Sequence, residues 1–184
     1  GLSDWDAIED ARKAIAHINF ISDEGSFICS GGLLTDTDDS SSIPYLLTAH
    51  HCIDDQTLAE TMETWFYYVA SDTVADDSEW PLLPFSDSPP DGWSGDSPIY
   101  GFPNPSGREQ CPPRAAFSST RGASLVDTSA VDDHSLLILD ETPPEESVYL
   151  GWTDREVALD GGELLYRLSH PLGTPQAYSV HRID

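Results

Sequence analysis

Short strand-like segments separated by turn residues run through this chain and restrict the folds open to it. "KAIAHINFI" alternates as a strand does, and "HSLLILD" is a short apolar run of strand length. "SFICSGGLLTD" has the same character but holds Gly31-Gly32, which is typical of a bulge or a barrel corner. Further segments of this kind are "AETMETWFYYVAS", "RAAFSSTRGASLV", "SVYLGWTD", "GELLYRLSHP" and "QAYSVHRI". Many short strands with turns between them predict an all-β sandwich or barrel.

The charge of the chain excludes some classes of partner. Its 184 residues, 39% of them hydrophobic, suffice for one or two small domains with a core. The formal charge of −25 repels nucleic acid and anionic membrane surfaces. No apolar run approaches the roughly 20 residues that span a bilayer. We therefore expect no nucleic-acid partner and no membrane span. The acidic start "GLSDWDAIEDARKAIAHI" is unlike a signal peptide, so we expect a mature or trimmed chain.

Residues 70–114 differ from the rest of the chain. They hold most of the 14 prolines together with many Asp and Ser residues. Loops of this length are usually functional or partly disordered. We interpret the segment as a long surface insertion within a domain.

The three cysteines, Cys29, Cys52 and Cys111, leave two interpretations open. A pair plus one is the pattern of a secreted protein whose remaining cysteine has its partner elsewhere. Three buried free thiols in a cytosolic protein fit the spacing as well. If the compartment is oxidising, a Cys29–Cys52 bridge ties two predicted strands together.

The stretch "LTAHHC" at 47–52 places two histidines against Cys52 at the end of an apolar strand. A metal site, a structural corner and a catalytic base compete as explanations. Adjacent residues of a strand point to opposite faces, so His50 and His51 are poorly placed to bind one zinc ion. A Cys29–Cys52 bridge would instead hold His51 at a fixed corner, as a general base requires. We predict no metal.

A second stretch, "SAVDDHSLLILD", sets Asp132 and Asp133 directly before an apolar strand. A carboxylate in that position can be held next to an imidazole. There it fixes the tautomer of the ring and stabilises the imidazolium that forms during turnover.

These two motifs together resemble those of the trypsin-like serine peptidases. "LTAHHC" matches the catalytic-histidine motif, with the strand-borne "CSGG" before it, and "DDHSLLIL" matches the catalytic-aspartate motif. The branch that the chain looks most like is the bacterial secreted group related to lysyl endopeptidase, which also has a later "GW" and "HP". Here these are Gly151-Trp152 and His170-Pro171. The resemblance covers roughly residues 14–182.

The resemblance implies an all-β, chymotrypsin-like double β-barrel. We expect residues 1–140 to form a complete first barrel carrying the 70–114 insertion, and 141–184 to supply only the first strands of the second barrel. We expect His170 to be structural, with a place lining the substrate cleft of the second barrel as the alternative, and Trp152 to lie in the core.

Carried over by position, His51 is the general base, Asp133 orients it, and His50 is a framework residue. The reaction needs no cofactor. Protein or peptide substrates, a Cys29–Cys52 disulfide and a secreted, extracellular or periplasmic location follow from the same resemblance.

The nucleophile is missing from this pattern. In the family's order of His, Asp and Ser, the serine follows the aspartate on a "GDSGG"-like loop, and residues 134–184 hold no such loop. Ser97 in "WSGDSPIY" precedes Asp133 and lacks the two glycines. We expect the serine on a C-terminal companion chain or on a missing piece, so that this chain alone is inactive. The alternative is a catalytically inactive peptidase fold that serves as a binding or assembly subunit.

Overall fold

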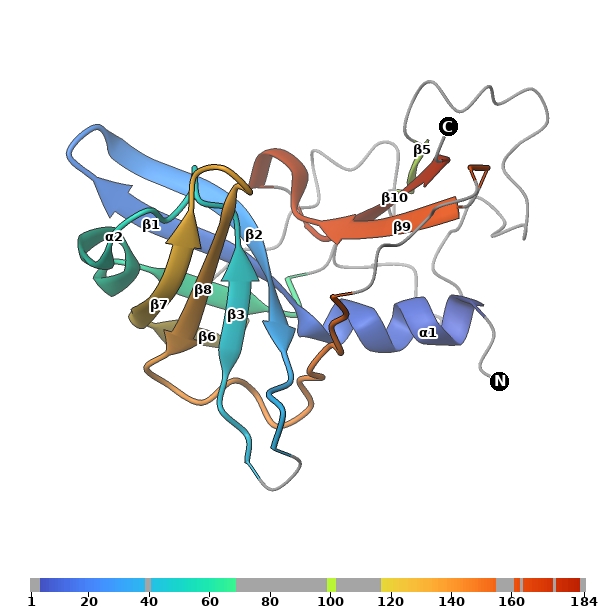
Figure 1. Ribbon diagram of the computed structural model, residues 1–184, viewed down its shortest axis with the longest axis horizontal. Helices are drawn as coiled ribbons and strands as arrows, with labels where there is room; N and C mark the ends of the chain where they lie inside the picture. Colours follow the sequence, from blue (N-terminus) through green and yellow to red (C-terminus); the bar gives the residue numbers. More distant parts are fainter. Residues whose placement is uncertain are drawn as a thin grey trace.

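The computed structural model describes residues 4–38, 41–68, 99–101, 117–154, 161–162, 164–173 and 175–182 (Figure 1). Two helices of α type and two 3-10 turns accompany ten strands in this part of the chain. The helical elements are α1 (Asp4–Ala11), η1 (Arg12–Ala14), α2 (Gln56–Glu60) and η4 (Pro171–Gly173). The strands are β1 (Ile15–Ser22), β2 (Gly25–Leu34), β3 (Tyr45–Thr48), β4 (Glu63–Phe66), β5 (Ile99–Gly101), β6 (Ser119–Arg121), β7 (Ala123–Ser129), β8 (His134–Leu139), β9 (Leu164–Ser169) and β10 (Ala177–Arg182).

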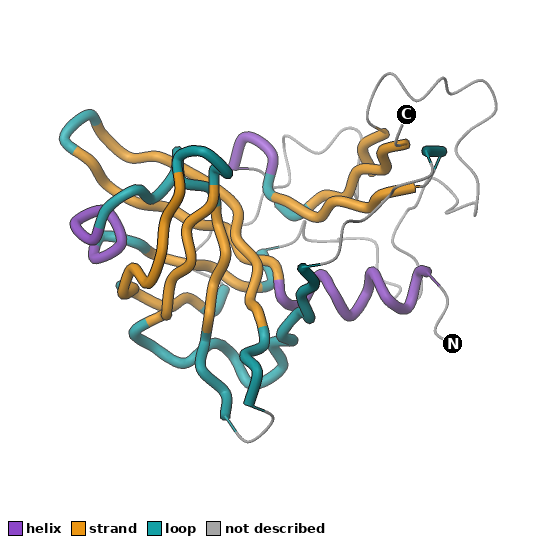
Figure 2. Tube along the Cα trace, viewed as in Figure 1, coloured by secondary structure: helices purple, strands orange, loops and turns teal. Residues whose placement is uncertain are grey.

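The larger sheet has seven strands in the order β6-β4-β1-β2-β3-β8-β7, and every pair whose register is known is antiparallel. Its two edge strands, β6 and β7, are consecutive in the chain and separated only by Gly122. One bent segment therefore forms both edges, which curls the sheet into a barrel (Figures 1 and 2). The prediction of an all-β first barrel is confirmed.

Nearly every strand of the larger sheet contributes at least one apolar side chain to the barrel interior. In β8 burial alternates along the strand, as "HSLLIL" predicts. In β1 the first four residues are all buried, so the alternation expected from "KAIAHINFI" is not seen there. Each of the largest interior side chains is at most 1% exposed, namely Ile18, Leu33, Leu46, Ile53, Met62, Phe66 and Leu137. Removing such side chains from water is the main stabilising contribution to a domain of this size.

Gly122 makes the bend between β6 and β7 possible. Its φ of +74° lies in the left-handed region, and an added Cβ would sit 2.6 Å from Oδ2 of Asp140. Its N–H donates to the Met62 carbonyl, and its own carbonyl accepts from the Asp140 N–H. The bend is thus held from both sides.

Gly122→Ala should lower the free energy of unfolding by about 1–3 kcal/mol, because alanine adopts this φ only under strain. Urea denaturation measures the change. Gly151→Ala is the matched control, because a Cβ there meets nothing within 4 Å and the φ is ordinary. Equal stabilities of the two variants would show that the bend does not depend on glycine.

A second, smaller sheet has the order β5-β10-β9. Its strand β5 comes from the predicted insertion at 70–114, so that segment reaches the second sheet and is more than a surface loop of the first barrel. Strand β5 thus lies before residue 140 and pairs with β10, which lies after it. The remainder of the insertion, with Ser97 and Cys111, lies outside the described residues.

The two sheets meet through a buried aromatic and imidazole cluster. The ring of His170, which follows β9, lies 5.3 Å from His17 of β1 and is stacked at 5.8 Å on Tyr68. Trp65 packs edge-on against His17 at 5.6 Å. His170 is only 4% exposed, which fits the structural role predicted for it.

The strand predicted around Trp65 is present as the four-residue β4, while the start of "AETMETWFYYVAS" belongs to the short helix α2, which the Asp55 side chain caps at the Leu58 N–H. Two other local predictions were wrong. Around 147–154 only Leu150 forms a bridge, a parallel one with Leu34. Trp152 is 58% exposed, and its Nε1–H donates to the Thr35 carbonyl.

Among the described helices, none has the length and apolar character of a membrane span.

Candidate active site

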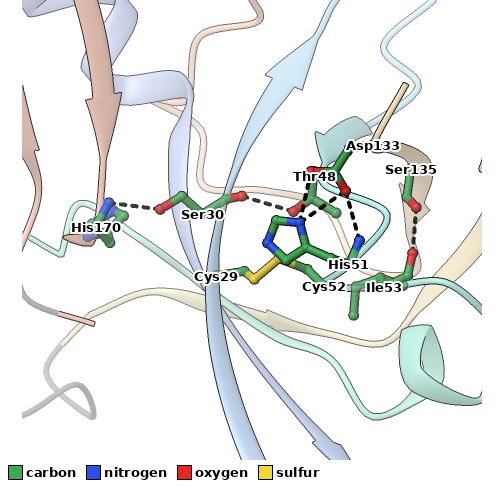
Figure 3. Close-up of a disulfide and its surroundings, with 9 residues drawn as sticks. All are labelled: Cys29, Ser30, Thr48, His51, Cys52, Ile53, Asp133, Ser135 and His170. Carbon is green, nitrogen blue, oxygen red and sulfur yellow. Dashed lines mark hydrogen bonds and ion pairs between the residues drawn. A yellow bond between two sulfur atoms is a disulfide. The ribbon is translucent and has the colours of Figure 1, made fainter. Parts of the chain in front are cut away.

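The corner that carries His51 is fixed by a disulfide and a tight turn. Cys29 of β2 is bonded to Cys52, with Cα atoms 6.4 Å apart, which confirms the predicted pairing. The N–H groups of Cys52 and Ile53 both donate to the Ala49 carbonyl, so the chain makes one helical turn here. Cys52 is 4% exposed, whereas the neighbouring His51 side chain is 71% exposed. The Cys52 end of the disulfide anchor is therefore buried and the imidazole is exposed. Figure 3 shows the His51 ring next to the Cys29–Cys52 bond.

His51 and Asp133 meet although 82 residues separate them. The His51 Nδ1 lies 3.0 Å from Oδ1 and 2.9 Å from Oδ2 of Asp133. The backbone N–H of His51 donates to the same Oδ1 at 3.0 Å. Because a carboxylate only accepts, the Nδ1 atom carries the proton and the Nε2 atom of a neutral ring is left as the basic nitrogen.

The turn between β7 and β8 aims the carboxylate of Asp133. Asp133 has φ +50°, a left-handed conformation that aspartate tolerates better than most residues. The neighbouring Asp132 is used differently, because its Oδ2 accepts from the Ser129 hydroxyl at 3.0 Å and its N–H donates back to that hydroxyl at 3.3 Å. Of the two adjacent aspartates in the motif, one closes the turn and the other faces the imidazole.

The contacts with His51 hold the pKa of Asp133 below the ordinary value of 3.8. The backbone N–H of His51 is the largest cause and its ring is the next. When folding lowers the pKa of a carboxyl group, that group stabilises the folded state at pH values above its unfolded-state pKa. That contribution is lost as the pH falls through the lowered folded-state value.

A carbon-13 NMR titration of the Asp133 carboxyl should therefore give a midpoint below 3.8. In His51→Ala the ring contact is removed while the backbone N–H remains, so the midpoint should rise but stay partly lowered. A wild-type midpoint at or above 3.8 would contradict the contacts described here.

His50 points to a different partner. Its Nδ1 lies 2.8 Å from the Thr128 hydroxyl of β7, while the His51 ring contacts Asp133. The Nδ1 atoms of the two histidines thus face different partners.

One set of possible metal-ligand atoms lies within 4.8 Å in the described part of the chain, formed by Cys29, His51 and Cys52. Both of its sulfur atoms are joined in the disulfide, so they are not the thiolates that zinc binds. This donor set is therefore an imidazole beside a disulfide.

The fold and the site together define a class. An antiparallel sheet curled into a barrel by one bent segment, part of a second sheet, and a His–Asp pair on the first barrel are features of the chymotrypsin fold. The structure of scabies mite inactivated protease paralogue S-I1 has this fold too. It superimposes with a TM-score of 0.52 at 14% identity, over 95% of this chain and 63% of that one.

Sequence comparison finds similarity to lysyl endopeptidase. A family model described as "Lysyl endopeptidase, C-terminal domain" matches residues 2–81. Lysyl endopeptidase of Pseudomonas aeruginosa is 28% identical over 181 residues, which are 97% of this chain and 31% of that protein. The chain is thus a relative of the trypsin-like peptidases, and it spans about a third of the length of the curated relative that it matches.

Proposed function

We propose that this chain provides the base and the orienting carboxylate of a secreted serine endopeptidase. The observation that carries the proposal is the His51–Asp133 pair, with Nδ1 held by both carboxylate oxygens and the ring exposed above a disulfide. The kinship with lysyl endopeptidase supports peptide-bond hydrolysis as the reaction.

In the proposed mechanism a serine hydroxyl attacks the carbonyl carbon of the scissile peptide bond. The Nε2 atom of His51 takes the serine proton, and Asp133 stabilises the imidazolium that results. His51 then gives this proton to the leaving amine, and the acyl-enzyme remains. Water, deprotonated by the same nitrogen, releases the acid and restores the serine. Backbone N–H groups near the serine would stabilise the oxyanion.

We place the serine on a segment C-terminal to Asp184, whether in the same polypeptide or in a companion chain. Two observations support this position. Asp133 is 53% exposed, and a triad carboxylate is normally buried, so its exposed face offers room for a covering segment. The lysyl endopeptidase relative is about three times as long as this chain.

Activity measurements on two samples test the proposal. The natural protein that contains this sequence should hydrolyse a labelled protein substrate, and a fluorophosphonate should abolish that activity. Peptides with a single lysine are the first defined substrates to try, since the relative is named for lysyl bonds. Residues 1–184 alone should be inactive. Hydrolysis by 1–184 alone would overturn the position of the serine, and an inert natural protein would favour a binding or assembly role.

A further inference from the structure

A series of hydrogen bonds next to the candidate pair runs from His50 through Thr128 and Ser135 to the Ile53 carbonyl. The His50 Nδ1 is 2.8 Å from the Thr128 hydroxyl, which is 2.7 Å from the Ser135 hydroxyl. Ser135 in turn donates to the Ile53 carbonyl (Figure 3). Thr128 and Ser135 are directly opposite each other in the β7–β8 register, and Ser135 is fully buried.

The donor and acceptor in each of these hydrogen bonds follow from the Ile53 carbonyl at the end of the series. A carbonyl only accepts, so the single proton of Ser135 points to Ile53. Thr128 must then donate its proton to Ser135, with the His134 carbonyl as a longer acceptor at 3.2 Å. No proton of Thr128 is left for His50, so the His50 Nδ1–H is the donor.

These hydrogen bonds connect the two turns that carry the candidate pair. His50 and Ile53 flank the turn that carries His51, and Thr128 and Ser135 flank the hairpin turn that carries Asp133. The contact between the His51 ring and the Asp133 carboxylate is exposed to water, where such a contact is weak. The hydrogen bonds of His50, Thr128 and Ser135 are buried or half-buried. A fully satisfied network in such surroundings holds its side chains in place more firmly.

We propose that His50, Thr128 and Ser135 are positioning residues, and that the one-way hydrogen-bond chain between them fixes His50 as the Nδ1–H tautomer and sets the His51–Asp133 geometry. The catalytic part of this inference rests on the proposed function, because a base must be held close to its reacting geometry to act. The tautomer and the geometry of the pair do not depend on that function.

The first test is spectroscopic and uses the 184-residue chain. Long-range proton–nitrogen NMR of neutral His50 should show the Nδ1–H tautomer, and the His51 Nδ1 proton should give a sharp low-field signal. Thr128→Ser keeps the hydroxyl and should keep both features. Thr128→Val has the same size without a hydroxyl, and should lose the His50 tautomer and broaden the His51 signal. An Nε2–H tautomer of wild-type His50, or a valine variant identical to wild type, would overturn the proposal.

The second test is kinetic and uses the natural protein. Thr128→Val should lower kcat roughly ten- to hundredfold with little change in KM, since misplacement of a catalytic group by about 1 Å has effects of this size. Thr128→Ser should restore most of the rate. Thr120→Val is the matched control, because Thr120 is a buried barrel threonine whose hydroxyl has no hydrogen-bond partner among the described residues.

The two tests separate the two proposals. A natural protein that hydrolyses nothing contradicts the proposed function. The NMR spectra still decide whether the hydrogen bonds of His50, Thr128 and Ser135 set the geometry of the His51–Asp133 pair. An active protein whose valine variant keeps the wild-type kcat contradicts the positioning role alone. Equal losses in Thr128→Val and Thr120→Val would also contradict it, since they indicate a general loss of barrel structure.

Discussion

Asp133→Asn should lower kcat of the natural protein by about 10⁴-fold, the size of effect that this change has in chymotrypsin-like triads. The structure explains the loss. The His51 backbone N–H donates to Oδ1, so an asparagine would keep its oxygen there and turn its NH₂ group to the place of Oδ2, 2.9 Å from Nδ1. That group donates, so the ring must accept at Nδ1 and carry its proton on Nε2. His51 could then no longer take the serine proton.

A second surface pair provides the control for this substitution. His134 and Asp127 are 3.4 Å apart, with the imidazole half-buried and the carboxylate exposed. Asp127→Asn makes the same chemical change beside a different histidine and should leave kcat within about twofold of wild type, as surface substitutions normally have little effect. Equal kcat values for Asp133→Asn and wild type would show that the exposed pair is not catalytic.

Loss of the Cys29–Cys52 bridge should have the largest effect on stability. The bridge closes a loop with a sequence separation of 23, for which chain-entropy estimates give about 3 kcal/mol of stabilisation. The double variant Cys29→Ser, Cys52→Ser removes it without leaving a free thiol from this pair. Because Cys52 is next to His51, the variant should lose peptidase activity under conditions in which the barrel is still folded.

Urea denaturation with and without a reductant measures the contribution of the bridge. Wild type should lose about 3 kcal/mol in the reductant. The double variant should be insensitive to it, which also controls for any reaction of Cys111. A wild-type midpoint unchanged by complete reduction would contradict the stabilising role.

Part of the barrel could be predicted from sequence, because strands such as β3 and β8 have a period of two and one buried face. Each alternating segment required only local information, as the burial pattern of β8 shows. The bend at Gly122 had a weak signal, a glycine between two strand-like stretches. The pairing of β5 with β10 had none, since a three-residue strand within a proline-rich segment has no periodicity to detect.

The candidate site divides in the same way. His51 and Asp133 were predicted from local motifs, and the structure brings them together. The proposed positioning residues Thr128 and Ser135 were not predicted, because a threonine or a serine in a strand is ordinary. The contact between His50 and Thr128 joins positions 78 residues apart. Only the register of β7 against β8, and of β8 against β3, places these hydroxyls next to the histidine turn.

The central claim is that His51 acts on a serine supplied from beyond residue 184. Its most direct test is to label the natural protein with a fluorophosphonate and locate the labelled residue by peptide mass spectrometry. We predict a single labelled serine C-terminal to Asp184, and no labelling in His51→Ala. A label on a serine within residues 1–184, such as Ser97, or labelling that persists in His51→Ala, would contradict the account.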